Sequence, residues 1–178
     1  MTTTDKLDHS VPTGVVPTKA FSELSTADVL YAGGKGANLG RLTQAGLPVP
    51  PGFVVGAPAY AAFRVQTGLA DRLKAALADL DVEDTAALQR AAGQAREAVR
   101  DSTPPAWLTQ AIGAAYDQLV QGDGDAAVAV RSSATAEDTA SASFAGMNET
   151  FLNVCGREAV IEAVKHCWQS LFGARTVY

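Results

Sequence analysis

Three glycines and a lysine, Gly33-Gly34-Lys35-Gly36, precede a segment whose apolar residues recur at helical spacing up to Gly46. This pattern predicts a helix that begins in the glycines and stops at Gly46. The first turn of a helix carries unpaired amides and partial positive charge, so a cation there costs about 0.3–1 kcal/mol unless an anion lies nearby. Glycines also let several amides approach one phosphate. The segment indicates a phosphate site. The alternative is a glycine turn that carries a solvated lysine. The segment is not a Walker A sequence, because no Ser or Thr follows Lys35.

Arg131 stands at the end of a short apolar run, residues 126–130, which predicts a buried strand. Its planar guanidinium can hold two oxygens of a phosphate, and the small residues Ser132-Ser133 let a ligand approach the backbone. Arg131 is therefore a second candidate for phosphate binding. An internal salt bridge to Glu137 or Asp138 is the alternative.

A loop of small residues, 141–148, leads through Gly146 into a strand predicted at residues 151–154. Loops of this composition bind phosphate through backbone amides without any catalytic side chain. We expect this loop to fold over a nucleotide. A flexible surface connection is the alternative.

The rest of the pattern predicts an α/β fold in which helices flank a small sheet. Residues 1–18 mix Thr, Pro, Gly and charges without periodicity, which indicates a flexible leader, so we expect one folded unit over residues 19–178 with order beginning near Phe21. Further strands are predicted at residues 21–24 and 53–55. Helices are predicted from residue 57, over 69–80 and 84–100, after Pro105, and from Gly156 to a cap at Gly173.

Length and charge limit the classes of protein to which this chain can belong. The 178 residues suffice for one domain with a core, and the net charge of -5 disfavours nucleic acid or anionic lipid as a partner. No apolar stretch approaches the roughly 20 residues that span a bilayer, and the N-terminus has no hydrophobic segment typical of a secretory signal. We therefore expect a cytoplasmic protein. The two cysteines and two histidines lack metal-ligand spacing, so no metal site is predicted.

Four motifs resemble the N-terminal nucleotide-binding part of the phosphoenolpyruvate synthase family in order and approximate spacing, from about residue 21 to residue 178. Pyruvate phosphate dikinase and rifampin phosphotransferase share this region. The third motif is similar to the synthase or the rifampin enzyme rather than the dikinase, and residues 150–154 favour the synthase. The resemblance implies the N-terminal subdomain of an ATP-grasp fold. The motifs are Gly33-Gly34-Lys35-Gly36-Ala37-Asn38-Leu39, Gly46-Leu47-Pro48-Val49-Pro50-Pro51-Gly52-Phe53, Val130-Arg131-Ser132-Ser133-Ala134-Thr135-Ala136-Glu137-Asp138 and Ser143-Phe144-Ala145-Gly146.

The resemblance implies that Lys35 and Arg131 contact the phosphates of ATP and that the loop carrying Gly146 closes over them. It also implies Mg²⁺ bound with the nucleotide, by ligands in a second ATP-grasp half outside this chain. In the complete enzyme, ATP, pyruvate and water would give phosphoenolpyruvate, AMP and phosphate through a phosphohistidine. No residue here is assigned a catalytic role, and Thr139-Ala140 and Met147-Asn148 depart from the family pattern. The supporting residues are Gly33, Gly34, Gly36, Ser132, Ser133 and Ala145.

Two other functions stay open from the sequence. One is the same ATP-binding part of a rifampin phosphotransferase. The other is a nucleotide-binding or interaction module without turnover, in which Trp168, Leu171 and Phe172 form an uncovered face that drives self-association or docks the second ATP-grasp half. His166 is predicted to be a partly buried helical residue, and neither it nor His9 matches the family's phosphohistidine.

Overall fold

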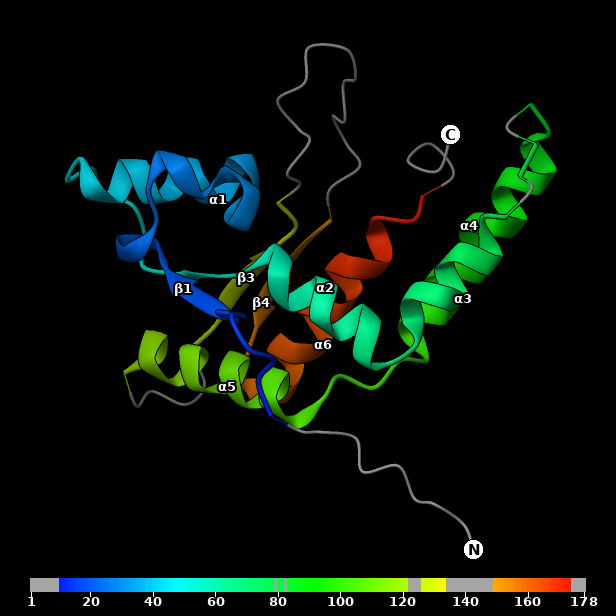
Figure 1. The fold of residues 1–178 in the computed structure, drawn as a ribbon. Coiled ribbons are helices and arrows are strands. Elements are labelled where there is room, and N and C mark those ends of the chain that lie inside the picture. The colour runs from blue at the N-terminus through cyan, green and yellow to red at the C-terminus, as the bar shows by residue number, and fades with distance from the viewer. Residues whose placement is uncertain (1–9, 79, 82, 122–125, 134–148, 174–178) are drawn as a thin grey trace, which may run out of the picture.

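Figure 1 shows the computed structural model, which describes residues 10–78, 80–81, 83–121, 126–133 and 149–173. In this part of the chain, six α-helices accompany two separate two-stranded antiparallel sheets, and two short 3₁₀ turns precede the first helix. The α/β class predicted from the sequence is confirmed, although the strands form two small sheets where we expected one. None of the described helices is long and apolar enough to cross a membrane.

The first sheet consists of β1 (Thr18–Ala20) and β2 (Phe53–Val55), which run antiparallel. β2 lies where the sequence predicted a strand. The strand predicted at residues 21–24 is wrong, because Phe21–Glu23 form a 3₁₀ turn, η1. The Ala20 amide donates to the Glu23 carboxylate at 2.7 Å, and this local bond closes the turn in competition with strand pairing.

The folded part of the chain begins before Phe21, earlier in the sequence than predicted. The Val16 carbonyl accepts a hydrogen bond from the Tyr31 hydroxyl at 3.2 Å. The Pro17 carbonyl accepts one from the Gly56 amide at 3.0 Å. These bonds tie the residues just before β1 to the helices that follow it in sequence. The leader predicted over residues 1–18 stays a prediction, and residues 1–9 lie outside the described part of the chain.

Five helices follow the first one, and each lies close to its predicted place. The helix predicted over residues 69–80 ends earlier, at Ala76, and the last helix ends at Ser170, before the cap predicted at Gly173. Asp84 is an N-cap, because its carboxylate accepts hydrogen bonds from the amides of Ala86 at 2.8 Å and Ala87 at 3.1 Å. The five helices are α2 (Ala57–Gln66), α3 (Leu69–Ala76), α4 (Thr85–Arg100), α5 (Ala106–Val120) and α6 (Arg157–Ser170).

The hydrophobic core joins α5 to the helices around it. Tyr116 on α5 is only 1% exposed, and its hydroxyl donates to the Ala126 carbonyl at 2.8 Å while accepting from the Gly156 amide at 2.9 Å. These two bonds fix α5 to the segments that enter β3 and α6. Each large apolar side chain buried here contributes about 1.5–3 kcal/mol. The core includes Phe63, Leu69, Leu73, Val99, Trp107, Leu108, Ile112, Val120, Val160 and Val164.

The end of α6 is covered more than expected. Trp168, Leu171 and Phe172 are all half-buried. The Trp168 ring centroid lies 4.9 Å from that of Tyr60 and 5.1 Å from that of Phe63, and both partners belong to α2. Because α2 packs on this aromatic face, the described residues give no support to the predicted uncovered face. Self-association through it stays a prediction.

The second sheet pairs β3 (Val128–Arg131) with β4 (Thr150–Val154), and Arg131 lies opposite Thr150. Both strands were predicted and are confirmed. The prediction that the first is buried is wrong, because burial alternates along it and Ala129 and Arg131 are exposed. α6 packs against β3 and leaves alternate side chains outside. Arg131 therefore ends the strand with its side chain exposed.

Candidate nucleotide-phosphate site

The helix α1 (Val29–Gln44) contains a break at Gly33, whose φ of 69° and ψ of 170° are non-helical. This region of backbone conformation is populated almost only by glycine. The helix resumes at Gly34, so residues 34–36 form a new first turn inside α1. The helix start predicted in the glycines corresponds to this resumed helix, and the turn that begins at Val29 was not predicted.

Ser133 contacts the glycine turn from a distant part of the sequence. Its Oγ lies 3.2 Å from the Gly36 amide, which donates to it across a separation of 97 residues. A Cβ placed on Gly33 would lie 2.6 Å from the carbonyl oxygen of Ser133 and 2.8 Å from its carbonyl carbon, closer than real Cβ contacts. The two segments that the sequence singled out for phosphate binding therefore meet in the fold.

The glycine turn also packs on the first sheet. A Cβ at Gly36 would lie 3.1 Å from Cγ2 of Val54 in β2 and 2.9 Å from Cβ of Ala32. The first turn of the resumed helix thus fits between β2 on one side and Ser133 on the other. A small residue is required at Gly36 because the side chains of Ala32 and Val54 already fill the space that a Cβ would take.

The predicted site residues fall into two groups. Lys35 is half-buried in the glycine turn, Arg131 is exposed at the end of β3, and Ser132 is 7% exposed, with its amide donating to the Glu149 carbonyl at 3.4 Å. These residues, together with Gly33, Gly34, Gly36 and Ser133, belong to the two segments that meet. The others, Ala145 and Gly146, and the salt-bridge alternatives Glu137 and Asp138, lie outside the described residues.

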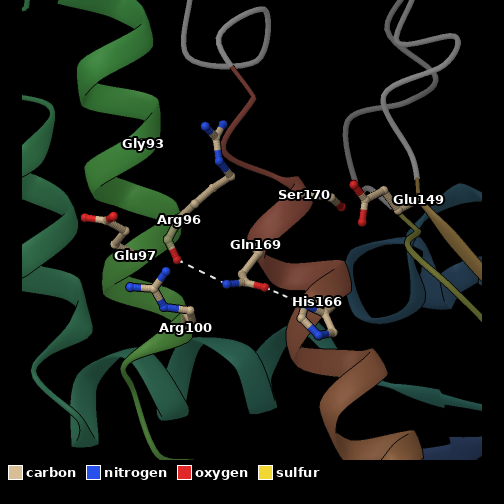
Figure 2. Close-up of a pocket in the computed structure, with 8 residues that line it drawn as sticks. All are labelled: Gly93, Arg96, Glu97, Arg100, Glu149, His166, Gln169 and Ser170. Carbon is tan, nitrogen blue, oxygen red and sulfur yellow. Dashed lines mark hydrogen bonds between the residues drawn. The ribbon is translucent and has the colours of Figure 1, made fainter.

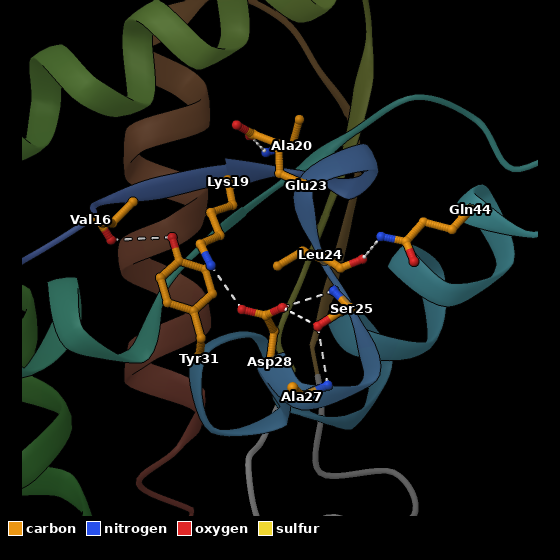
Figure 3. A network of polar contacts seen from close by, with 10 residues as sticks. All are labelled: Val16, Lys19, Ala20, Glu23, Leu24, Ser25, Ala27, Asp28, Tyr31 and Gln44. Carbon is orange, nitrogen blue, oxygen red and sulfur yellow. Dashed lines mark hydrogen bonds and ion pairs between the residues drawn. The ribbon is translucent and has the colours of Figure 1, made fainter.

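A polar network that sequence reasoning missed fixes the start of α1 (Figure 3). Lys19 Nζ on β1 lies 2.8 Å from Asp28 Oδ1, and the other oxygen of Asp28 accepts from the Ser25 amide at 2.8 Å and the Ser25 hydroxyl at 2.7 Å. The bond from Lys19, then those from Ser25, hold the pKa of Asp28 at about 2. The pattern Ser25-x-x-Asp28 is a capping box, and this sequence pattern could have predicted the network.

Tyr31 anchors the same turn to two other elements. Its hydroxyl bonds to Val16 just before β1, and Lys19 Nζ lies 4.7 Å from its ring centroid. Its ring also packs on Gly56, the N-cap of α2, where a Cβ would meet ring atoms. Burial, then the charges of Glu23 and Asp28, raises the pKa of Tyr31 to about 12. The break at Gly33 therefore follows a turn that is tied to β1 and α2.

A cavity of about 390 Å³ lies between α4 and α6 (Figure 2). Its polar groups largely satisfy one another: Arg96 Nη1 donates to the Phe172 carbonyl at 2.8 Å, Gln169 Nε2 donates to the Arg96 carbonyl at 3.3 Å, and His166 Nδ1 lies 2.6 Å from Gln169 Oε1. His166 is exposed, which corrects the prediction that it is partly buried. The lining contains none of the predicted ATP residues, although it includes Glu149, whose carbonyl accepts from the Ser132 amide. It comprises Gly93, Arg96, Glu97, Arg100, Glu149, His166, Gln169 and Ser170.

Within the described part of the chain, no three His, Cys, Asp or Glu side chains are grouped so that they could hold a metal ion. The residues brought together at the candidate site are a helix start, a lysine, an arginine and hydroxyl groups. Such an arrangement binds anions through amides and charge-assisted hydrogen bonds.

Comparison with known proteins finds similarity over most of the chain. Residues 29–178 match the family described as pyruvate phosphate dikinase, AMP/ATP-binding domain. A probable phosphoenolpyruvate synthase from Methanothermobacter thermautotrophicus is 49% identical over 160 residues, which are 89% of this chain and 23% of that protein. Phosphoenolpyruvate synthase from Neisseria meningitidis serogroup B is 47% identical over 163 residues, covering 88% of this chain and 20% of the relative. Phosphoenolpyruvate synthase from Pyrococcus furiosus is 40% identical over 194 residues, covering 90% of this chain and 24% of the relative.

The chain thus spans less than a quarter of the length of these three relatives. The family match covers both the glycine turn and the end of β3, which are the segments that meet around Ser133. On this match and these relatives, the chain belongs to the pyruvate phosphate dikinase AMP/ATP-binding domain family and is similar to phosphoenolpyruvate synthases.

Proposed function

We propose that this chain binds the phosphates of ATP between the glycine turn of α1 and the end of β3, as the nucleotide-binding part of a phosphoenolpyruvate synthase. The observation that carries the proposal is the hydrogen bond from the Gly36 amide to Ser133 Oγ at 3.2 Å. It brings the helix start that contains Lys35 next to the segment that contains Arg131.

The electrostatics of the site support this proposal. Lys35 belongs to the first turn of the resumed helix, where a cation costs about 0.3–1 kcal/mol without an anion and becomes favourable beside one. Arg131 is exposed at the end of β3, and its planar fork suits two phosphate oxygens. Backbone amides, an ammonium and a guanidinium would then act together on the same triphosphate.

The remaining contacts are part of the same proposal. The loop with Ala145 and Gly146 would cover the phosphates through its amides, and Mg²⁺ would accompany the nucleotide with ligands from a second ATP-grasp half. Phosphoryl transfer depends mainly on positioning and on stabilisation of phosphate charge, and this chain would supply that part.

The acceptor chemistry belongs to the complete enzyme. There, ATP, pyruvate and water would yield phosphoenolpyruvate, AMP and phosphate through a phosphohistidine, in the cytoplasm. The relatives carry the synthase name, which favours this reaction over rifampin phosphorylation. We assign nucleotide binding to this chain and the transfer to pyruvate to regions that the match does not cover.

Calorimetric titration with ATP and magnesium tests the proposal. Lys35→Ala and Arg131→Ala should each weaken binding by about tenfold to a hundredfold, the range for a lost charge-assisted hydrogen bond. Arg41→Ala is the matched control, because it removes an exposed cation from the last turn of the same helix and should leave affinity unchanged.

Retention of wild-type affinity by both site variants would refute the assignment. Absence of any binding by the wild-type chain calls for a repeat with the remaining ATP-grasp half supplied. A second failure would end the nucleotide-site proposal.

A further inference from the structure

Ser133 supplies a capping group that the break in α1 lacks. The side chain of an N-cap residue normally accepts a hydrogen bond from the second or third amide of its helix. Gly33 occupies the N-cap position of the resumed helix and has no side chain. Ser133 Oγ instead accepts from the Gly36 amide, the third of that helix, at 3.2 Å. The helix is therefore capped from outside, by a residue at the end of β3.

Ser133 is itself held in place. The preceding residue, Ser132, is buried, and its amide donates to the Glu149 carbonyl at 3.4 Å, which extends the β3–β4 pairing beyond Arg131. The backbone of Ser133 also packs directly against Gly33, with no room for a Cβ between them. The hydroxyl thus connects the glycine turn to a strand end whose position the second sheet determines.

We propose that Ser133 is a positioning residue for ATP: its hydroxyl caps the resumed helix and sets the spacing between Lys35 and Arg131. This role rests on the proposed function, because it concerns how the two sides of the phosphate site are held. A cap that only stabilised the helix would change stability and leave ATP affinity unchanged. A positioning cap changes affinity in the folded protein and acts through Lys35 and Arg131.

Two variants and one control separate these roles. Ser133→Ala removes the acceptor, whereas Ser133→Thr keeps a hydroxyl at the same position. Asp84→Ala removes an N-cap from α4, which does not contribute to the site. Amide hydrogen exchange at Gly36, measured by NMR without nucleotide, reports the cap itself. Calorimetry with ATP and magnesium reports its consequence, and far-UV circular dichroism verifies that each variant is folded.

Ser133→Ala should speed exchange at Gly36 and weaken ATP binding about fivefold, the factor that corresponds to a typical capping bond. Ser133→Thr should restore both, and Asp84→Ala should leave both unchanged. In the Lys35→Ala background, Ser133→Ala should cost less affinity than in the wild type, because the two residues act as one unit.

An unchanged hydrogen-exchange rate of the Gly36 amide in Ser133→Ala would disprove the cap, whatever the ATP affinity of this variant. Faster exchange with wild-type affinity would overturn the positioning role, and the phosphate site would stand if Lys35→Ala and Arg131→Ala still lose ATP. Equal losses of ATP affinity from Ser133→Ala in the wild-type and Lys35→Ala backgrounds would also overturn the positioning role. If the wild type and the Ser133 variants bind no ATP even when the remaining ATP-grasp half is supplied, the proposed function fails and the positioning role fails with it.

Discussion

Replacing Gly33 by alanine tests the close approach on which the site is built. Gly33 has a φ of 69° and a ψ of 170°, a conformation that costs a residue with a Cβ about 1–3 kcal/mol. The new Cβ would also lie 2.6 Å from the Ser133 carbonyl oxygen and 2.8 Å from its carbon. These are backbone atoms, so the end of β3 or the start of the resumed helix must move.

The two effects together set the expected size. Forcing an extra group into a filled space typically costs about 1–3 kcal/mol. Gly33→Ala should therefore lower the free energy of unfolding by about 2–6 kcal/mol, a large part of the 5–15 kcal/mol typical of a domain. Because the contact with Ser133 is pushed apart, ATP affinity should fall as well.

Gly46→Ala is the matched control. Gly46 also has a positive φ, 72°, but nothing lies within 4 Å of the position where its Cβ would be placed. This variant should cost only about 1–2 kcal/mol, from the backbone conformation alone. Urea unfolding followed by circular dichroism measures both variants. A Gly33→Ala cost equal to that of Gly46→Ala would refute the close approach to Ser133.

Two further predictions concern the scaffold. Tyr116→Phe removes a hydroxyl that bonds to two backbone groups, so it should lower the free energy of unfolding by about 1–3 kcal/mol in urea titrations, and an unchanged midpoint would contradict this. The pKa of Asp28 is lowered from its ordinary 3.8 to about 2, so its stabilising effect is full above pH 4 and is lost as the pH falls toward 2. Between pH 4 and pH 2, the free energy of unfolding should therefore fall less in Asp28→Asn than in the wild type. Equal falls in the two proteins would argue against the pairing of Asp28 with Lys19.

Local patterns in the sequence predicted much of the fold. The stop at Gly46, the strand at residues 53–55 and the helices from α2 to α6 follow from periodicity and from Gly and Pro signals. The 3₁₀ turn after Ala20 was missed, because a single bond to Glu23 outweighs the weak strand preference of three residues. Predictions of this kind fail where one side chain decides between two local structures.

The candidate site shows a different limit. The glycine turn and Arg131 could each be picked out, since a cation at a helix start and an arginine after an apolar strand are unusual in sequence. That Ser133 caps the turn could not be predicted, because it pairs segments 97 residues apart. The side chain that normally reveals a cap is absent from Gly33 itself. Only the tertiary fold, which places the residue Ser133 after β3 beside α1, brings its replacement into position.

The most direct measurement of the central claim is an NMR titration of the ¹⁵N-labelled chain with ATP and magnesium. Binding at the proposed site predicts that the largest amide shifts fall on residues 33–36 and 131–133, and that they are lost in Arg131→Ala. The cavity between α4 and α6 should stay unaffected, with Gly93 and Gln169 as its reporters. Shifts centred on that cavity, with residues 33–36 unchanged, would contradict the account.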